Sequence, residues 1–132
     1  MTDGRAAYAF AYLRVVPQVH LGSFQNVGVV LHARTRGFIG LRVVTDPGEL
    51  KRRVPQADIP LLVRYLESLR AIAEGDPTAG HVALLPPSER FHWLTAPRSD
   101  VLQCSPVHTG VAAEPESVLD RLFAPIGGPP SA

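Results

Sequence analysis

The sequence predicts an α+β fold in which an antiparallel sheet is packed by one long helix and one or two short helices. Three stretches rich in β-branched and aromatic residues follow one another near the start of the chain, which favours strands. Leucines at helical spacing come next, which favours a long amphipathic helix. Short apolar runs and a second helix signal fill the C-terminal part. This order predicts a meander with C-terminal strands added to it.

The first three strands are expected at residues 7–16, 24–33 and 38–44, as an antiparallel meander. Successive side chains on a strand point to opposite faces of the sheet, so each strand contributes to two faces. One expected face is aliphatic and lies under the long helix: Ala7, Ala9, Ala11, Leu13, Val15, Val27, Val29, Leu31, Ile39, Leu41 and Val43. The other mixes aromatic and polar side chains: Tyr8, Phe10, Tyr12, Arg14, Phe24, Asn26, Val30, His32, Phe38 and Arg42.

Two helices are expected after the meander. Asp46 precedes a proline and is followed three residues later by Glu49, the pattern of a capping box at the start of a short helix. The long helix is expected at residues 58–74, with Asp58 as its N-cap and Gly75 as its terminator. Its apolar stripe consists of Leu62, Leu66, Leu69 and Ala73.

The C-terminal part is expected to add two short strands, at residues 91–95 and 101–105, and a helix that starts near Pro115. A loop rich in proline and glycine connects this part to the long helix. The expected organisation is a single α+β domain of residues 1–126, followed by a disordered tail of residues 127–132.

Composition narrows the classes of function. The 132 residues carry a formal net charge of +1, which argues against a domain dedicated to nucleic-acid phosphates. The single cysteine excludes an internal disulfide framework. Neither a signal peptide nor a run long enough to span a membrane is recognisable, so we expect a cytoplasmic protein without a membrane partner.

The sequence contains no recognisable catalytic motif. Cys104, His108 and Asp100 are the residue types of a thiol nucleophile with its base and acid, but a lone cysteine in a strand is more often a small buried apolar residue. The histidines and the cysteine do not match a recognised metal-ligand spacing. The catalytic residues therefore stay unknown, and we expect no metal and no cofactor.

The arginines offer a different chemistry. Arg90 stands next to the aromatic pair on either side of His92, and Arg98 and Ser99 occupy a turn. Together these residues could hold a phosphate or carboxylate. The alternative is that these arginines pair with nearby carboxylates and cover apolar surface with their stems. Residues 98–108 are expected to cover or flank the aromatic and polar face of the sheet. A polar cluster between the sheet and the C-terminal segment follows from this placement.

Three stretches of sequence carry a family resemblance: "YAFAYLRVVP", "GSFQNVGVVLHA" and "RFHWLTAPRSDVLQCSPVHTG", followed by a short terminal helix. Together they resemble the bacterial family of domain of unknown function 3037, over about residues 7–124. The resemblance implies a small protein with a protein partner, for which a HipA-like kinase is a candidate, and it implies no particular reaction. The motif positions that it carries over are Arg14, Pro17, Asn26, Gly28, Arg90, Arg98, Ser99, Gln103, Ser105 and His108.

Two hypotheses of function follow. The first is a non-catalytic binding or accessory module for a protein partner. The second is an enzyme or sensor that acts on a phosphorylated small molecule or nucleotide through a pocket of arginine and histidine. The candidate binding residues are Arg14, Asn26, Arg90, Arg98, Ser99, Gln103 and His108. We also expect a homodimer, because three strands expose two edges and an aromatic face.

Overall fold

A computed structural model describes residues 4–16, 24–96 and 102–127 of the chain. Its strands are β1 (Ala6–Val15), β2 (Gln25–Ala33), β3 (Phe38–Val43), β4 (Leu102–Cys104) and β5 (His108–Ala112). Its α-helices are α1 (Pro47–Arg53), α2 (Ile59–Glu74), α3 (Pro87–Thr95) and α4 (Pro115–Gly127). Short 3₁₀ turns lie at η2 (Arg34–Arg36), η3 (Pro77–Ala79) and η4 (His81–Leu84). None of the helices in the described ranges has the length and apolar character needed to cross a membrane.

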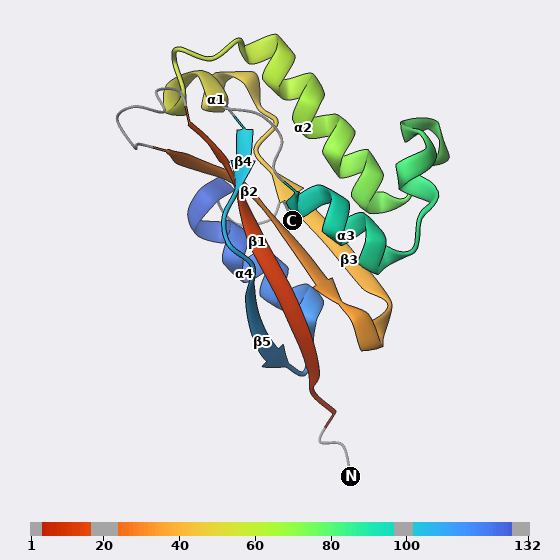
Figure 1. The fold of residues 1–132 in the computed structure, drawn as a ribbon. Coiled ribbons are helices and arrows are strands. Elements are labelled where there is room, and N and C mark those ends of the chain that lie inside the picture. Colours follow the sequence, from red (N-terminus) through yellow and green to blue (C-terminus); the bar gives the residue numbers. More distant parts are fainter. Residues whose placement is uncertain (1–3, 17–23, 97–101, 128–132) are drawn as a thin grey trace.

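The five strands form one antiparallel sheet (Figure 1). The order β3-β2-β1 is the predicted meander, and Gly37 takes a left-handed conformation, with a φ of 59°, in the turn between β2 and β3. β4 pairs with the C-terminal end of β1, and β5 pairs with its N-terminal end. The predicted α+β class, with C-terminal strands added to the meander, is therefore confirmed.

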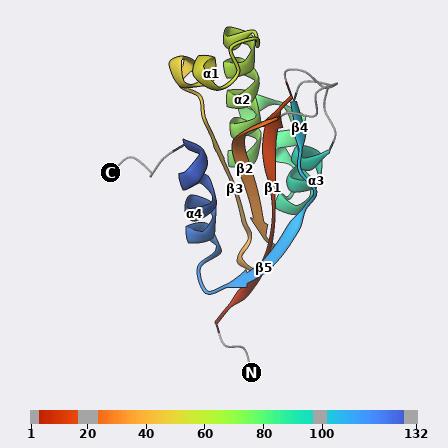
Figure 2. The same cartoon turned by 90° about the vertical axis from the view of Figure 1, so that its left-hand side faces the viewer.

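Helices cover both faces of the sheet (Figure 2). α2 and α3 pack on one face, where Leu13 and Leu41 of the sheet join Leu66 and Leu69 of α2 in the larger apolar cluster. α4 packs on the opposite face, where its Leu119 contributes to a smaller cluster with aromatic neighbours. The long helix thus lies on the aliphatic face of β1 and β3, as predicted.

The predicted face assignment of β2 is wrong by one residue. Leu31 lies opposite Phe10, and Val29 lies opposite Tyr12, so both point to the aromatic face that α4 covers. Val30 instead belongs to the cluster under α2. The row with Val29 and Leu31 is the more apolar one, but apolar clusters lie on both faces of the sheet, so alternation alone does not reveal which helix that row faces. A shift in register near the end of the β1–β2 ladder adds one residue and changes the phase again.

Residues 91–95 form part of a helix and not the predicted strand. α3 begins with Pro87 in its first turn, where a proline is tolerated. Phe91 and Leu94, three residues apart, are both buried, while His92 between them is exposed. Five residues are too few to separate a period of two from a helical period, which explains the error.

The predicted helix ends are largely confirmed. The Asp46 carboxylate accepts from the backbone N–H of Glu49 at 2.9 Å, and Asp58 caps α2 in the same way. α2 ends at Gly75, with a φ of 75°. The Glu49 side chain bonds two arginines of α1 instead of completing the predicted capping box. α4 extends to Gly127, and the rest of the expected tail lies outside the described residues.

Candidate functional site

Three of the candidate residues lie side by side at one end of the sheet. Arg14 of β1 has Asn26 of β2 as its register partner on one side and Gln103 of β4 on the other. Residues in register across neighbouring antiparallel strands point to the same face. Asn26, Arg14 and Gln103 therefore form one polar row, which we call the Arg14 row. Of the segment 98–108, the described residues 102–108 flank the sheet beside β1, as β4 and the start of β5, and α4 covers the aromatic face.

The Arg14 row contains polar atoms without partners. The guanidinium carbon of Arg14 lies 4.0 Å from the centroid of the Phe24 ring, in a cation–π contact. Arg14 Nε and Asn26 Oδ1 are buried, and neither has a hydrogen-bond partner in the part of the chain that the structure describes. Such an atom typically costs about 1–3 kcal/mol of stability. Two further candidates, Arg98 and Ser99, lie outside the described residues.

Arg90 holds α3 against the end of α2. Its Nε donates to the carbonyl of Leu85 at 2.8 Å. Its Nη1 donates to the carbonyls of Ala73 at 2.7 Å and Ile72 at 3.3 Å. The last four carbonyls of a helix have no partner within the helix, and Arg90 donates to two of them, of which that of Ile72 also accepts from the Gly75 N–H. This pattern of contacts is that of a structural tie between two helices.

His108 lies far from the Arg14 row. It stands opposite Phe10 on β1, and the centroids of the two rings are 5.2 Å apart. Phe10 and Arg14 share a face of β1 but are four residues apart, which corresponds to about 13 Å along a strand. The structure therefore places Arg14, Arg90 and His108 at three separate positions and does not bring them into one pocket.

Cys104 and His108 do not form the pair that a thiol nucleophile would need. Cys104 lies opposite Leu13, and His108 lies opposite Phe10, so their side chains point to opposite faces of the sheet. The Cys104 thiol donates to the carbonyl of Leu94 at 3.2 Å. Within the described ranges, no group of three or more His, Cys, Asp and Glu side chains is placed to hold a metal ion.

Two other family positions have structural contacts. The Ser105 N–H donates to the Tyr12 carbonyl, and the Tyr12 N–H donates to Ser105 Oγ, both at 2.8 Å. Ser105 thereby continues the ladder between β4 and β5. A Cβ at Gly28 would lie 2.6 Å from Val43 Cγ1, so only glycine fits there. Pro17 lies outside the described residues.

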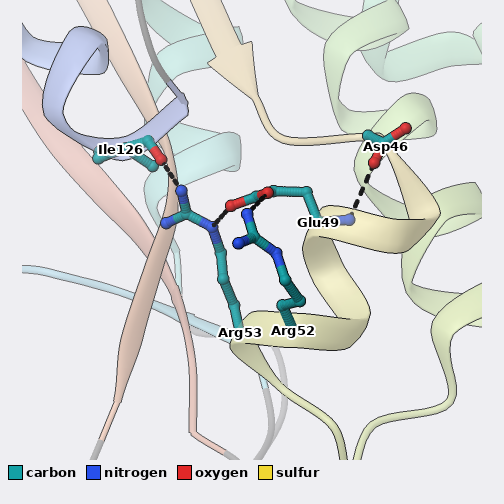
Figure 3. Close-up of polar contacts among 5 residues, drawn as sticks. All are labelled: Asp46, Glu49, Arg52, Arg53 and Ile126. Atoms are coloured by element: carbon teal, nitrogen blue, oxygen red, sulfur yellow. Dashed lines mark hydrogen bonds and ion pairs between the residues drawn. The ribbon is translucent and has the colours of Figure 1, made fainter.

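A cavity of about 620 Å³ lies between the end of β3, α1 and the end of α4. It is lined by Val43, Val44, Thr45, Asp46, Glu49, Arg53, Phe123 and Gly127. The Glu49 carboxylate accepts from Arg52 and Arg53, and Arg53 also donates to the Ile126 carbonyl (Figure 3). The hydrogen bond from Arg52, then that from Arg53, holds the pKa of Glu49 below its ordinary value. A ligand would compete with these contacts, so we assign the cavity no binding role.

The outer edge of β5 has a different character. No strand pairs with it among the described residues, and it forms the lower outer border of the sheet (Figure 1). Val111 is 59% exposed and Val107 is 48% exposed. The stretch 107–113, "VHTGVAA", contains no proline and no Asp, Glu, Lys or Arg. Natural proteins usually protect a sheet edge with charges, prolines or bulges, so this edge is open to a further strand.

Sequence reasoning missed β5. The β-branched Thr109 and Val111 are a strand signal, but Pro106 and Gly110 obscure it, because both residue types are rare inside strands. Glycine at this position leaves room for the Tyr8 side chain, since a Cβ there would lie 2.4 Å from the Tyr8 hydroxyl oxygen.

Comparisons with known proteins give a family without a described activity. No curated protein and no solved structure matches the chain. A family described as "Protein of unknown function (DUF3037)" matches residues 10–126, which is most of the sequence. The chain therefore belongs to the DUF3037 family.

Proposed function

We propose that the chain is a non-catalytic accessory module that binds a protein partner by adding a strand of that partner to the outer edge of β5. The observation that carries the proposal is the exposed and uncharged edge of β5. In strand addition, main-chain hydrogen bonds supply affinity, and contacts to alternate side chains supply specificity. The exposed Val107 and Val111 suit a partner segment that is extended and apolar.

The opposite edge of the sheet, formed by β3, is less suited to pairing with a further strand. β3 carries Arg42, whose Nε forms an ion pair with Asp120 of α4 at 3.1 Å. Both α2 and α4 contact β3. A charged side chain on an edge strand disfavours pairing with a further strand, so β5 is the better docking edge.

The partner that we propose is a HipA-like kinase, on the basis of the family resemblance in the sequence. The test is co-expression with the HipA-like kinase of the host, followed by affinity purification. We expect a stable complex with the wild type and its loss in Val111→Lys, because a lysine on the edge opposes strand pairing. The matched control is Leu61→Lys, at a residue of α2 that is 54% exposed.

Two results would contradict this proposal. One is the absence of a complex between the wild type and the kinase. The other is a complex that Val111→Lys and Leu61→Lys retain equally, because the edge of β5 would then not be the contact surface.

The second candidate function is an enzyme or sensor that acts on a phosphorylated small molecule or nucleotide. The observation in its favour is Arg14 Nε, a buried donor without a partner among the described residues. Its support is weaker, because Arg90 is bound to carbonyls and His108 lies about 13 Å along β1 from the Arg14 row. Binding of inorganic phosphate that depends on Arg14 would favour it.

A further inference from the structure

Two exposed valines stand at equal spacing on either side of Thr109 of β5. Val111 stands two residues after it on the same face of β5, and Val107 stands two residues before it, immediately ahead of the first residue of β5. His108 and Gly110 stand one residue to either side of it, on the other face. If two β5 strands pair antiparallel with Thr109 opposite Thr109, each His108 meets a Gly110, and each Val107 meets a Val111 once the pairing extends one residue ahead of β5.

We propose that two copies of this chain pair through β5 in that register and form a two-fold symmetric dimer with one continuous sheet. The inference rests on the same edge as the proposed function and names a second copy of the chain as an occupant of that edge. Antiparallel pairing of a strand with its own copy gives an isologous interface, in which the same patch is used twice.

Side-chain complementarity supports a second copy as the occupant. Pairing would cover Val107 and Val111, which are among the most exposed large apolar side chains of the described residues. On the other face the imidazole of His108 would lie opposite Gly110, the position that Tyr8 covers. Stacking of His108 on Phe10 would then continue into the aromatic side chains of the second copy.

Charge also permits the pairing. β5 contains no Asp, Glu, Lys or Arg, so two copies bring no like charges of these types into contact. Each β5 has only five residues, and stable dimers bury about 1,200–2,000 Å². We therefore expect a dimer that dissociates reversibly, so that a partner strand can displace the second copy from the edge.

Cysteine cross-linking tests the register. Thr109→Cys places two cysteines directly opposite each other, with Cα atoms about 4.5–5.5 Å apart, a distance that a disulfide can bridge. The matched control is Val111→Cys on the same face of the same strand. In the proposed register its two cysteines are about 13 Å apart along the strand and cannot be bridged. Both variants retain Cys104, which contributes the same background to each.

We expect the disulfide-linked dimer of Thr109→Cys to form at least about tenfold faster than that of Val111→Cys under mild oxidation, because only the first meets the geometric requirement. Sedimentation of the reduced wild type at tens of micromolar should show a dimer that Val111→Lys abolishes. Equal cross-linking rates for the two cysteine variants, or a monomeric wild type at that concentration, would overturn the proposal.

Different experimental results would reject the β5 dimer and the proposed function. A monomeric wild type that still forms a kinase complex sensitive to Val111→Lys would remove the dimer and keep the function. A dimer linked through Thr109→Cys, without any kinase complex, would keep the dimer and remove the proposed kinase partner.

Discussion

Arg14 and Arg90 occupy two junctions of the molecule and differ in what surrounds them. Arg90, between α2 and α3, donates to three backbone carbonyls, two of them at the end of α2. Arg14, at the end of β1, lies over Phe24 and leaves its buried Nε without a partner among the described residues. A helix end supplies unpaired carbonyls, whereas a central strand uses its backbone groups in the ladders on both sides. An arginine in the sheet therefore depends on side chains for its partners.

The largest effect is expected at the α2–α3 junction. Arg90→Ala removes three hydrogen bonds and leaves the carbonyls of Leu85, Ile72 and Ala73 without this donor. We expect the free energy of unfolding to fall by about 2–4 kcal/mol, because hydrogen bonds from charged donors are strong and the acceptors would be left partly buried. Urea denaturation measures the change.

A surface arginine provides the control for this variant. Arg64 of α2 is exposed, so Arg64→Ala should change the free energy of unfolding by less than about 0.5 kcal/mol. A loss below about 1 kcal/mol in Arg90→Ala would mean that solvent replaces its contacts easily, and the contrast with Arg14 would disappear.

Sequence patterns predicted the parts of the fold in which local chemistry dominates. Asp46, Asp58 and Gly75 mark helix ends through their own side chain or backbone conformation, and the structure shows them in those roles. Such local patterns do not predict which side chains of β2 point to which face of the sheet. Helices cover apolar clusters on both faces of the sheet, and only the pairing of Leu31 with Phe10 decides which face each row of β2 joins. That pairing is a tertiary property.

The candidate site was predictable only in part. Alternation along β1 and β2 predicted that Arg14 and Asn26 share a face, and the register adds Gln103 to them. The carbonyls that bind Arg90 could not be predicted, since they come from residues 5 to 18 positions away, where a loop and α2 fold back on α3. The sequence did not predict that His108 pairs with Phe10 of β1, about 13 Å along that strand from Arg14.

The second prediction is a loss of stability at acidic pH, on the side of the sheet that α2 and α3 cover. His32 stacks on Phe91 of α3 with ring centroids 5.5 Å apart. Burial, and then the positive charge of Arg34, lowers the pKa of His32 from its ordinary value of 6.5. The unfolded chain therefore binds a proton more readily than the folded one. Stability is fully present above about pH 6.5 and is lost as the pH falls from there toward the lowered pKa of the folded state.

Melting temperatures of wild type and His32→Leu, compared between about pH 7.5 and about pH 5.5, measure this effect. We expect the wild type to lose more stability than the variant over that interval, by less than Arg90→Ala costs. His92→Gln is the control, because His92 is exposed on α3 and its variant should keep the full pH dependence. An unchanged pH dependence in His32→Leu would show that another group titrates in this range.

The smallest effect is expected at the Arg14 row. Arg14→Met keeps an unbranched side chain beside Phe24 but removes the buried Nε that has no partner among the described residues. The lost cation–π contact and the removed unsatisfied donor have opposite signs, so the free energy of unfolding should stay within about 1 kcal/mol of wild type. Arg42→Met, which breaks an exposed ion pair with Asp120, gives the reference for a surface arginine.

Arg14→Met also separates two roles for the row, because a structural tie and an anion site respond differently to the loss of the guanidinium. A loss of about 3–5 kcal/mol, as for a broken buried ion pair, would show that Arg14 is tied as firmly as Arg90 and would end the contrast between the two junctions. A small change in stability, together with loss of inorganic phosphate binding seen in the wild type by calorimetry, would favour the second candidate function. A small change in the free energy of unfolding, with no phosphate binding by either protein, would contradict the second candidate function. The edge of β5 would then be the remaining candidate surface.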